Sequence, residues 1–141
     1  MQGLSKITYK STPEERTAIA FVNLLKVRKS LLRGHIWNAI EYVGRIRGQM
    51  MGLLTDNCTK DIHYCRPERD IEDYIEPLEL VRFAHTCPQY SAHSVALCAA
   101  ELIDQILDYL EKTQSDLPIE VQLREQKNWL TSFSEKPKED V

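Results

Sequence analysis

The sequence has few residues that break helices and no hydrophobic run long enough to cross a membrane. Only 5 glycines and 6 prolines occur in 141 residues, which argues against a loop-rich or disordered chain. The longest apolar runs, such as residues 18–22, contain about five residues, against roughly 18 in a bilayer span. The opening MQGLSKITYKS lacks the apolar core of a signal peptide, so we expect a cytoplasmic protein with no membrane partner.

The chain also lacks a strong positive charge and the motifs of nucleotide binding. Its 18 basic and 21 acidic residues give a net charge of -3, so no overall basic field would attract nucleic acid. Neither G-x-x-x-x-G-K-[ST] nor G-x-G-x-x-G is present. With 43% hydrophobic residues, the chain is long enough to form one domain with its own core.

The clearest pattern lies between residues 31 and 54. Apolar residues recur there every three or four positions, which is typical of an amphipathic helix with one buried face. The predicted buried stripe consists of Ile36, Trp37, Ala39, Ile40, Val43, Ile46, Arg47, Met50, Leu53 and Leu54. The polar face carries a row at four-residue spacing, Glu41, Arg45 and Gln49. Small residues at the same spacing favour the close approach of another helix, and they are Gly44, Gly48 and Gly52.

Start and stop signals place a second helix before this one. Thr12, Pro13 and Glu15 form the capping box of a helix start, and Gly34 is the expected break. The apolar residues that we read along this helix are Ile19, Val22, Leu25 and Leu32. The short connection at Gly34 favours two antiparallel neighbours.

Further helices follow a polar loop over residues 55–66. Pro67 is expected to start a short helix, Pro77 to interrupt it, and residues 78–83 to add another turn or two. Ser91 caps a long helix, and Pro118 opens the last one. The apolar row of the long helix is Val95, Cys98, Ala99, Leu102, Ile106 and Leu110.

No run of strands is visible, so the sequence predicts an all-α protein. We expect an up-and-down helical bundle of about five helices. Residues 1–11 form an N-terminal arm, residues 12–133 the single bundle domain, and residues 134–141 a flexible tail.

The polar row and its aromatic neighbours are the candidate substrate-binding residues: Trp37, Glu41, Tyr42 and Arg45. One interpretation is a surface ion pair that merely supports the helix. The other is a site in which the carboxylate and the aromatic faces hold a small cationic or sugar-like ligand. No catalytic residue is assigned.

Two His-x-Cys steps raise the question of a metal. They are His63-Tyr64-Cys65 and His85-Thr86-Cys87, with Cys58 nearby, and histidine and cysteine are the preferred ligands of zinc. Their spacing matches no C-x-x-C framework, so we assign no metal ligand and no cofactor. A small zinc-stabilised domain stays open as an alternative.

The run LLRGHIWNAIEYVGRIRGQMMGLL resembles the helical C-terminal half of bacterial aminoglycoside- and lincosamide-type nucleotidyltransferases. Two sets of residues carry the resemblance, which spans about residues 16–112. The first fits R-G-x-x-W-x-A and a later arginine loosely, with Arg33, Gly34, Trp37, Ala39 and Arg45. The second fits P-x-Y-x-x-x-S, with Pro88, Tyr90 and Ser94.

The resemblance lacks the catalytic half. In that family an N-terminal α/β half supplies a Gly-Ser turn and paired aspartates that hold magnesium, and this chain has no Gly-Ser and no D-x-D. The resemblance therefore implies a substrate-binding or association module that is not catalytic by itself. Its implied partner is a second copy in a homodimer or a separate catalytic nucleotidyltransferase subunit. The alternative is a dimeric helical regulatory or interaction protein.

Overall fold

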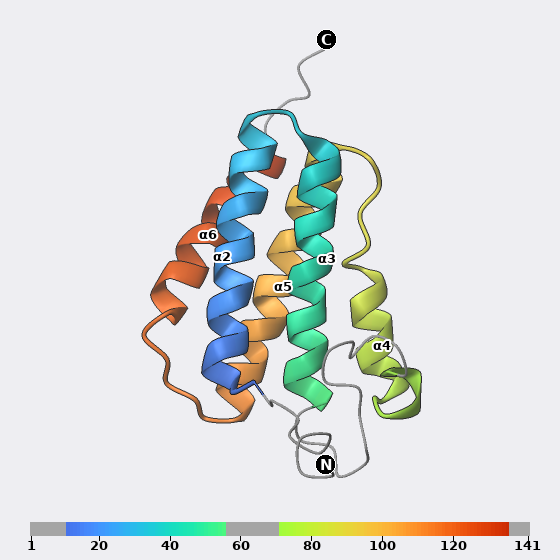
Figure 1. Cartoon of the computed structure of the whole chain (residues 1–141), viewed down its shortest axis with the longest axis vertical. Coiled ribbons are helices and arrows are strands. Elements are labelled where there is room, and N and C mark those ends of the chain that lie inside the picture. Colours follow the sequence, from blue (N-terminus) through green and yellow to red (C-terminus); the bar gives the residue numbers. More distant parts are fainter. Residues whose placement is uncertain (1–10, 56–70, 136–141) are drawn as a thin grey trace, which may run out of the picture.

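Five α-helices and one 3-10 helix make up the part of the chain that the computed structural model describes, residues 11–55 and 71–135 (Figure 1). In chain order they are α2 (Pro13–Leu32), α3 (Ile36–Thr55), η2 (Ile71–Asp73), α4 (Pro77–Ala84), α5 (Ala92–Lys112) and α6 (Glu120–Ser134). All regular elements within these ranges are helical, which confirms the all-α bundle.

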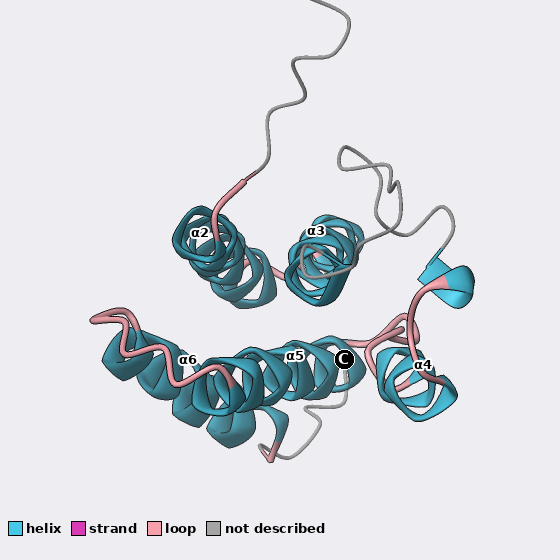
Figure 2. Ribbon diagram, turned by 90° about the horizontal axis from the view of Figure 1, so that it is seen from below, coloured by secondary structure: helices cyan, strands magenta, loops and turns pink. Residues whose placement is uncertain are grey.

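The four long helices form two layers. α2 and α3 make one layer and α5 and α6 the other, while α4 lies beside the bundle (Figure 2). Each layer is an antiparallel hairpin of helices consecutive in the chain, as expected from short connections. The core between the layers is aliphatic, and its largest fully buried side chains are Leu24, Ile46, Leu53, Leu102, Ile103, Ile106, Leu110, Leu123, Leu130, Val27, Val43 and Val95.

The two ends of α2 follow the predicted signals. Thr12 accepts a hydrogen bond from the backbone N–H of Glu15, whose carboxylate accepts one from the backbone of Thr12, so the capping box is complete. At the other end Gly34 has a φ of 72°, the left-handed conformation that glycine adopts without strain. The N–H of His35 donates to the carbonyl of Ser30 at 2.9 Å, which closes the helix end and turns the chain into α3.

The buried face of α2 differs from the row that the sequence suggested. Its core residues are Ala20, Leu24, Val27 and Leu31. The row read from the sequence is largely outside the core: the exposed fractions are 42% for Ile19, 49% for Val22, 43% for Leu25 and 64% for Leu32. Apolar residues occur on both sides of this helix, so periodicity alone did not identify the side that packs on α3 and α5.

The periodic pattern of α3 identified its buried face more accurately. Ala39, Val43, Ile46, Met50 and Leu53 are buried, as predicted. Ile36, Ile40 and Leu54 are partly buried against the core, whereas Trp37 is 69% exposed. It lies about 200° around the helix from Ala39, so the two side chains cannot share one buried face.

α4 begins at Pro77, which the sequence suggested as an interruption. Proline suits the first helical turn because the N–H that it lacks would have no partner within the helix. Arg47 of α3 holds the end of this segment, donating from Nε to the hydroxyl of Thr86 at 2.7 Å and from Nη2 to its carbonyl at 2.6 Å. Arg47 is therefore a half-buried polar clamp rather than part of an apolar stripe.

α5 is the central helix and follows its prediction closely. Ser91 caps it by accepting from the backbone N–H of Ser94 at 3.0 Å. The predicted apolar row is buried in full: Val95, Cys98, Ala99, Leu102, Ile106 and Leu110. α6 packs antiparallel to α5, and the guanidinium of Arg28 on α2 lies 4.6 Å from the Trp129 ring of α6.

Candidate functional site

The four candidate residues lie on α3, and the structure brings three of them together. Arg45 forms an ion pair with Glu41 at 3.5 Å, and its guanidinium lies 5.4 Å from the centre of the Tyr42 ring. Lys26 of α2 lies at the same distance from that ring. The Tyr42 ring therefore contacts two cations, and this local charge favours an anionic ligand over a cationic one.

The fourth candidate, Trp37, has a different neighbour. Its ring packs on Tyr90, which precedes α5, with 4.9 Å between ring centres and 46° between ring planes. Tyr90 is 59% exposed, so the pair forms an aromatic surface at the start of α3. No interaction described here links this pair to Glu41.

The ion pair of Glu41 and Arg45 is exposed. The side chains are 66% and 56% exposed, and such i, i+4 pairs contribute about 0.3–0.5 kcal/mol to stability. The pair therefore orients two side chains at the surface rather than holding the fold together.

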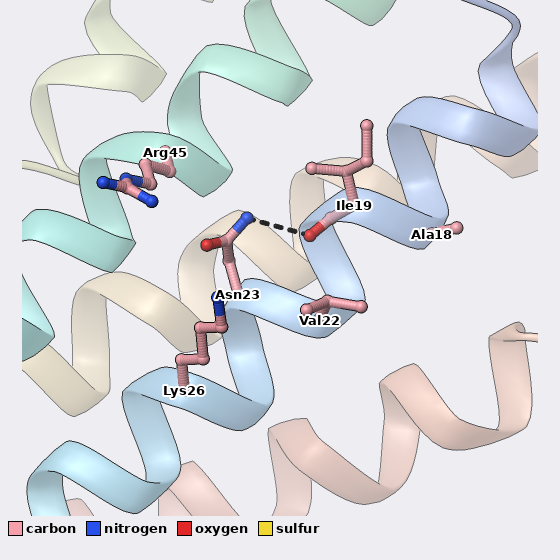
Figure 3. A pocket seen from close by; sticks show the side chains of 6 residues that line it. All are labelled: Ala18, Ile19, Val22, Asn23, Lys26 and Arg45. Atoms are coloured by element: carbon pink, nitrogen blue, oxygen red, sulfur yellow. Dashed lines mark hydrogen bonds between the residues drawn. The ribbon is translucent and has the colours of Figure 1, made fainter.

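A shallow groove runs between α2 and α3 beside these residues (Figure 3). It encloses about 320 Å³ and is lined by Ala18, Ile19, Val22, Asn23, Lys26 and Arg45. The amide of Asn23 donates to the carbonyl of Ile19 at 2.9 Å, which satisfies that donor within its own helix. The lining is therefore mainly aliphatic, and the two cations, Lys26 and Arg45, lie on opposite helices (Figure 3).

A second hollow lies at the closed end of the same hairpin, where α2 turns into α3. It encloses about 220 Å³ and is lined by Lys26, Lys29, Ser30, Arg33, His35, Asn38 and Tyr42. This set contains three cations, a histidine and three neutral side chains that can donate hydrogen bonds. No carboxylate lines it, although the whole chain carries a net charge of -3.

The cysteine and histidine steps do not form a metal site in the described residues. Within residues 11–55 and 71–135, no three His, Cys, Asp or Glu side chains lie close enough to hold an ion. Cys58, His63 and Cys65 lie outside those ranges. Cys87 is exposed, whereas Cys98 is buried and contacts the carbonyl of His85 through Sγ at 3.4 Å. Burial raises the pKa of the Cys98 thiol above its ordinary value.

None of the helices described here is both long and apolar enough to cross a membrane. Comparison with family models, curated proteins and solved structures gave no match. The resemblance to nucleotidyltransferases therefore stays a prediction.

Sequence reasoning missed the α2 half of this surface. The sequence pattern placed Ile19 and Val22 in the core, so it did not predict the surface groove that they line. A usable signal was present, because the apolar residues of α2 alternate with charges that change sign along the helix. Glu14 and Glu15 lie in the first turn, and Lys26 and Lys29 lie near the end.

Proposed function

We propose that this chain is an association module that forms a homodimer through the groove face of α2, by analogy with the helical half of a nucleotidyltransferase. The observation that carries the proposal is the set of partly exposed aliphatic side chains at the centre of that face, Ile19, Val22 and Leu25. In this proposal the catalytic subunit is a separate chain. A bacterial, cytoplasmic setting belongs to the same proposal.

Charge complementarity favours a second copy as the occupant of the groove. In a two-fold dimer with antiparallel α2 helices, residues equally far from the symmetry axis on either side face one another. If the symmetry axis passes midway between Ile19 and Val22, Ile19 of one copy packs on Val22 of its partner, and Val22 packs on the partner's Ile19. The same axis places the acidic first turn, Glu14 and Glu15, near Lys26 of the partner.

The expected gain is moderate. Full burial of one aliphatic side chain is worth about 1.5–3 kcal/mol, so covering a half-exposed one contributes roughly 1 kcal/mol. Ile19 and Val22 from both copies supply four such contributions, and the opposite charges add orientation more than affinity. These contributions are consistent with a reversible dimer.

Sedimentation equilibrium of the full chain tests this proposal. Wild-type protein should show a reversible monomer–dimer equilibrium at protein concentrations of about 1 mM, since about 4 kcal/mol corresponds to a Kd of about that size, and Val22→Glu should remain a monomer there because it places a charge at the centre of the interface. Val121→Glu on α6 is the matched control, since Val121 is 64% exposed away from the groove, and it should leave the dimer intact.

A charge exchange tests the antiparallel arrangement. Lys26→Glu should weaken the dimer, and adding Glu15→Lys should restore it, because this axis places position 15 opposite position 26 of the partner and the exchanged charges again face one another. A wild-type monomer would overturn the proposal. A dimer that tolerates Val22→Glu would show that another surface is used.

A further inference from the structure

The basic hollow at the closed end of the α2–α3 hairpin carries an inference beyond the proposed association. We propose that this hollow binds a phosphate group, either as free phosphate or on a small phosphorylated molecule. It shares one side chain, Lys26, with the groove, and its other lining residues are separate.

The first support is the concentration of positive charge. Lys26 and Lys29 lie one turn apart on α2, and Arg33 follows at the C-cap. Like charges at this spacing repel one another, and a bound anion converts that repulsion into attraction. Glu41 of α3 pairs with Arg45 and does not line the hollow.

The second support is the set of hydrogen-bond donors around the charge. Ser30 is only 7% exposed and presents a hydroxyl to the hollow, and Asn38 and Tyr42 add an amide and a phenol. Together with the guanidinium of Arg33 and the ammonium groups, they can donate to several oxygens of one oxyanion.

The third support is the backbone that holds these groups in place. Gly34 turns the chain so that Arg33 and His35 lie on either side of the helix junction, and the His35 N–H to Ser30 bond fixes the turn. The first turn of α3 contains no acidic residue that would neutralise the side-chain charges, and the positive end of the α3 dipole is offset by the negative end of the α2 dipole at the same junction.

The size of the hollow indicates the class of ligand. Its volume of about 220 Å³ lies below the roughly 300–1,000 Å³ of sites that enclose a drug-sized molecule. A phosphate group with part of a small organic moiety fits this volume. The ligand class is therefore a phosphate monoester or inorganic phosphate.

Isothermal titration calorimetry of the full chain tests the proposal, with inorganic phosphate, glucose 6-phosphate and glucose as probes. Both phosphates should bind with saturation and glucose should not. Tighter binding of glucose 6-phosphate would identify a phosphorylated molecule as the source, and equal binding would identify free phosphate.

Matched variants locate the site. Lys29→Gln with Arg33→Gln should weaken phosphate binding at least about ten-fold, because a charge-assisted hydrogen bond typically contributes that factor or more. Lys112→Gln with Arg124→Gln removes the same charge from exposed positions on α5 and α6 and should leave binding unchanged. Circular dichroism should show both variants folded, since all four side chains are exposed.

Absence of saturable phosphate binding, or an equal loss in both double variants, would overturn the proposal. Phosphate binding and dimerisation can be tested independently. Val22→Glu should keep phosphate binding as a monomer, so a missing dimer refutes only the association, and a dimer without phosphate binding refutes only this site.

Discussion

Replacing Gly52 with alanine tests how closely the Arg16 side chain of α2 packs against α3. A Cβ at Gly52 would lie 2.2 Å from both Cζ and Nη1 of Arg16, closer than atoms can approach. Arg16 is only 4% exposed, and its Nη1 donates to Oε1 of Gln49 at 3.2 Å. Gly52→Ala must therefore displace a buried guanidinium.

The magnitude follows from two opposing contributions. Losing a hydrogen bond of a charged group costs about 1.5–3 kcal/mol, and glycine to alanine inside a helix gains about 1 kcal/mol. We expect Gly52→Ala to lower the free energy of unfolding by about 0.5–2 kcal/mol, measured by urea denaturation. Gly44→Ala is the control, because the nearest atom to its Cβ is Nη1 of Arg47 at 3.8 Å, and it should stabilise by up to about 1 kcal/mol.

A double-mutant cycle isolates the contact. In an Arg16→Met background the guanidinium is gone, so Gly52→Ala should become nearly neutral or stabilising. If Gly52→Ala stabilises wild type as much as Gly44→Ala does, the close fit of Arg16 against Gly52 is refuted.

Two further predictions concern buried polar groups. The raised pKa of Cys98 means that the folded state favours the neutral thiol, so its contribution is complete below the unfolded pKa of about 8.5–9 and is lost as pH rises through the folded pKa. Urea midpoints should fall more steeply above about pH 8.5 in wild type than in Cys98→Ala, while Cys87→Ala should follow wild type; parallel curves for all three would contradict this. Oε1 of Gln126 is buried and has no hydrogen-bond partner among the described residues, so Gln126→Leu should raise the free energy of unfolding by about 1 kcal/mol. The exposed control Gln122→Leu should change it by less than about 0.5 kcal/mol, and a loss of stability in Gln126→Leu would show that the amide has a favourable partner.

The helices and their ends were predictable because their signals are local. The capping box at Thr12, the break at Gly34 and the cap at Ser91 each depend on residues within one turn, and all three are present. The buried face of α3 was mostly predictable because the charged row containing Glu41 and Arg45 marks its opposite side.

The packing of α2 could not be predicted in the same way. Leu24 is buried and Val22 is half exposed, although both belong to apolar rows of one helix. Which row packs depends on where α3, α5 and α6 lie, and that is not encoded in local spacing. Arg47 likewise could not be assigned its partner from the sequence. Thr86 lies 39 positions away, so no local spacing connects the two residues.

The candidate site was predictable only in part. Glu41, Tyr42 and Arg45 do lie together, but Lys26 comes from the neighbouring helix and makes the neutral set of Glu41 and Arg45 positive overall. The basic hollow depends on the hairpin turn, which places Lys29 of α2 and His35 of the α3 end around one space.

The attachment of α4 has a consequence for the order in which the protein opens. Phe83 is the buried residue of α4, and polar contacts complete its attachment: Arg47 donates to Thr86 just beyond the helix, and Arg82 pairs with Asp108 of α5 at 3.0 Å. Salt screens exposed ion pairs far more than it weakens an aliphatic core. Amide hydrogens of α4 should therefore exchange through local opening that rises with ionic strength, while those of α5 exchange only when the whole bundle unfolds. In that experiment α4 should open as a separate cooperative unit attached to a more stable four-helix body.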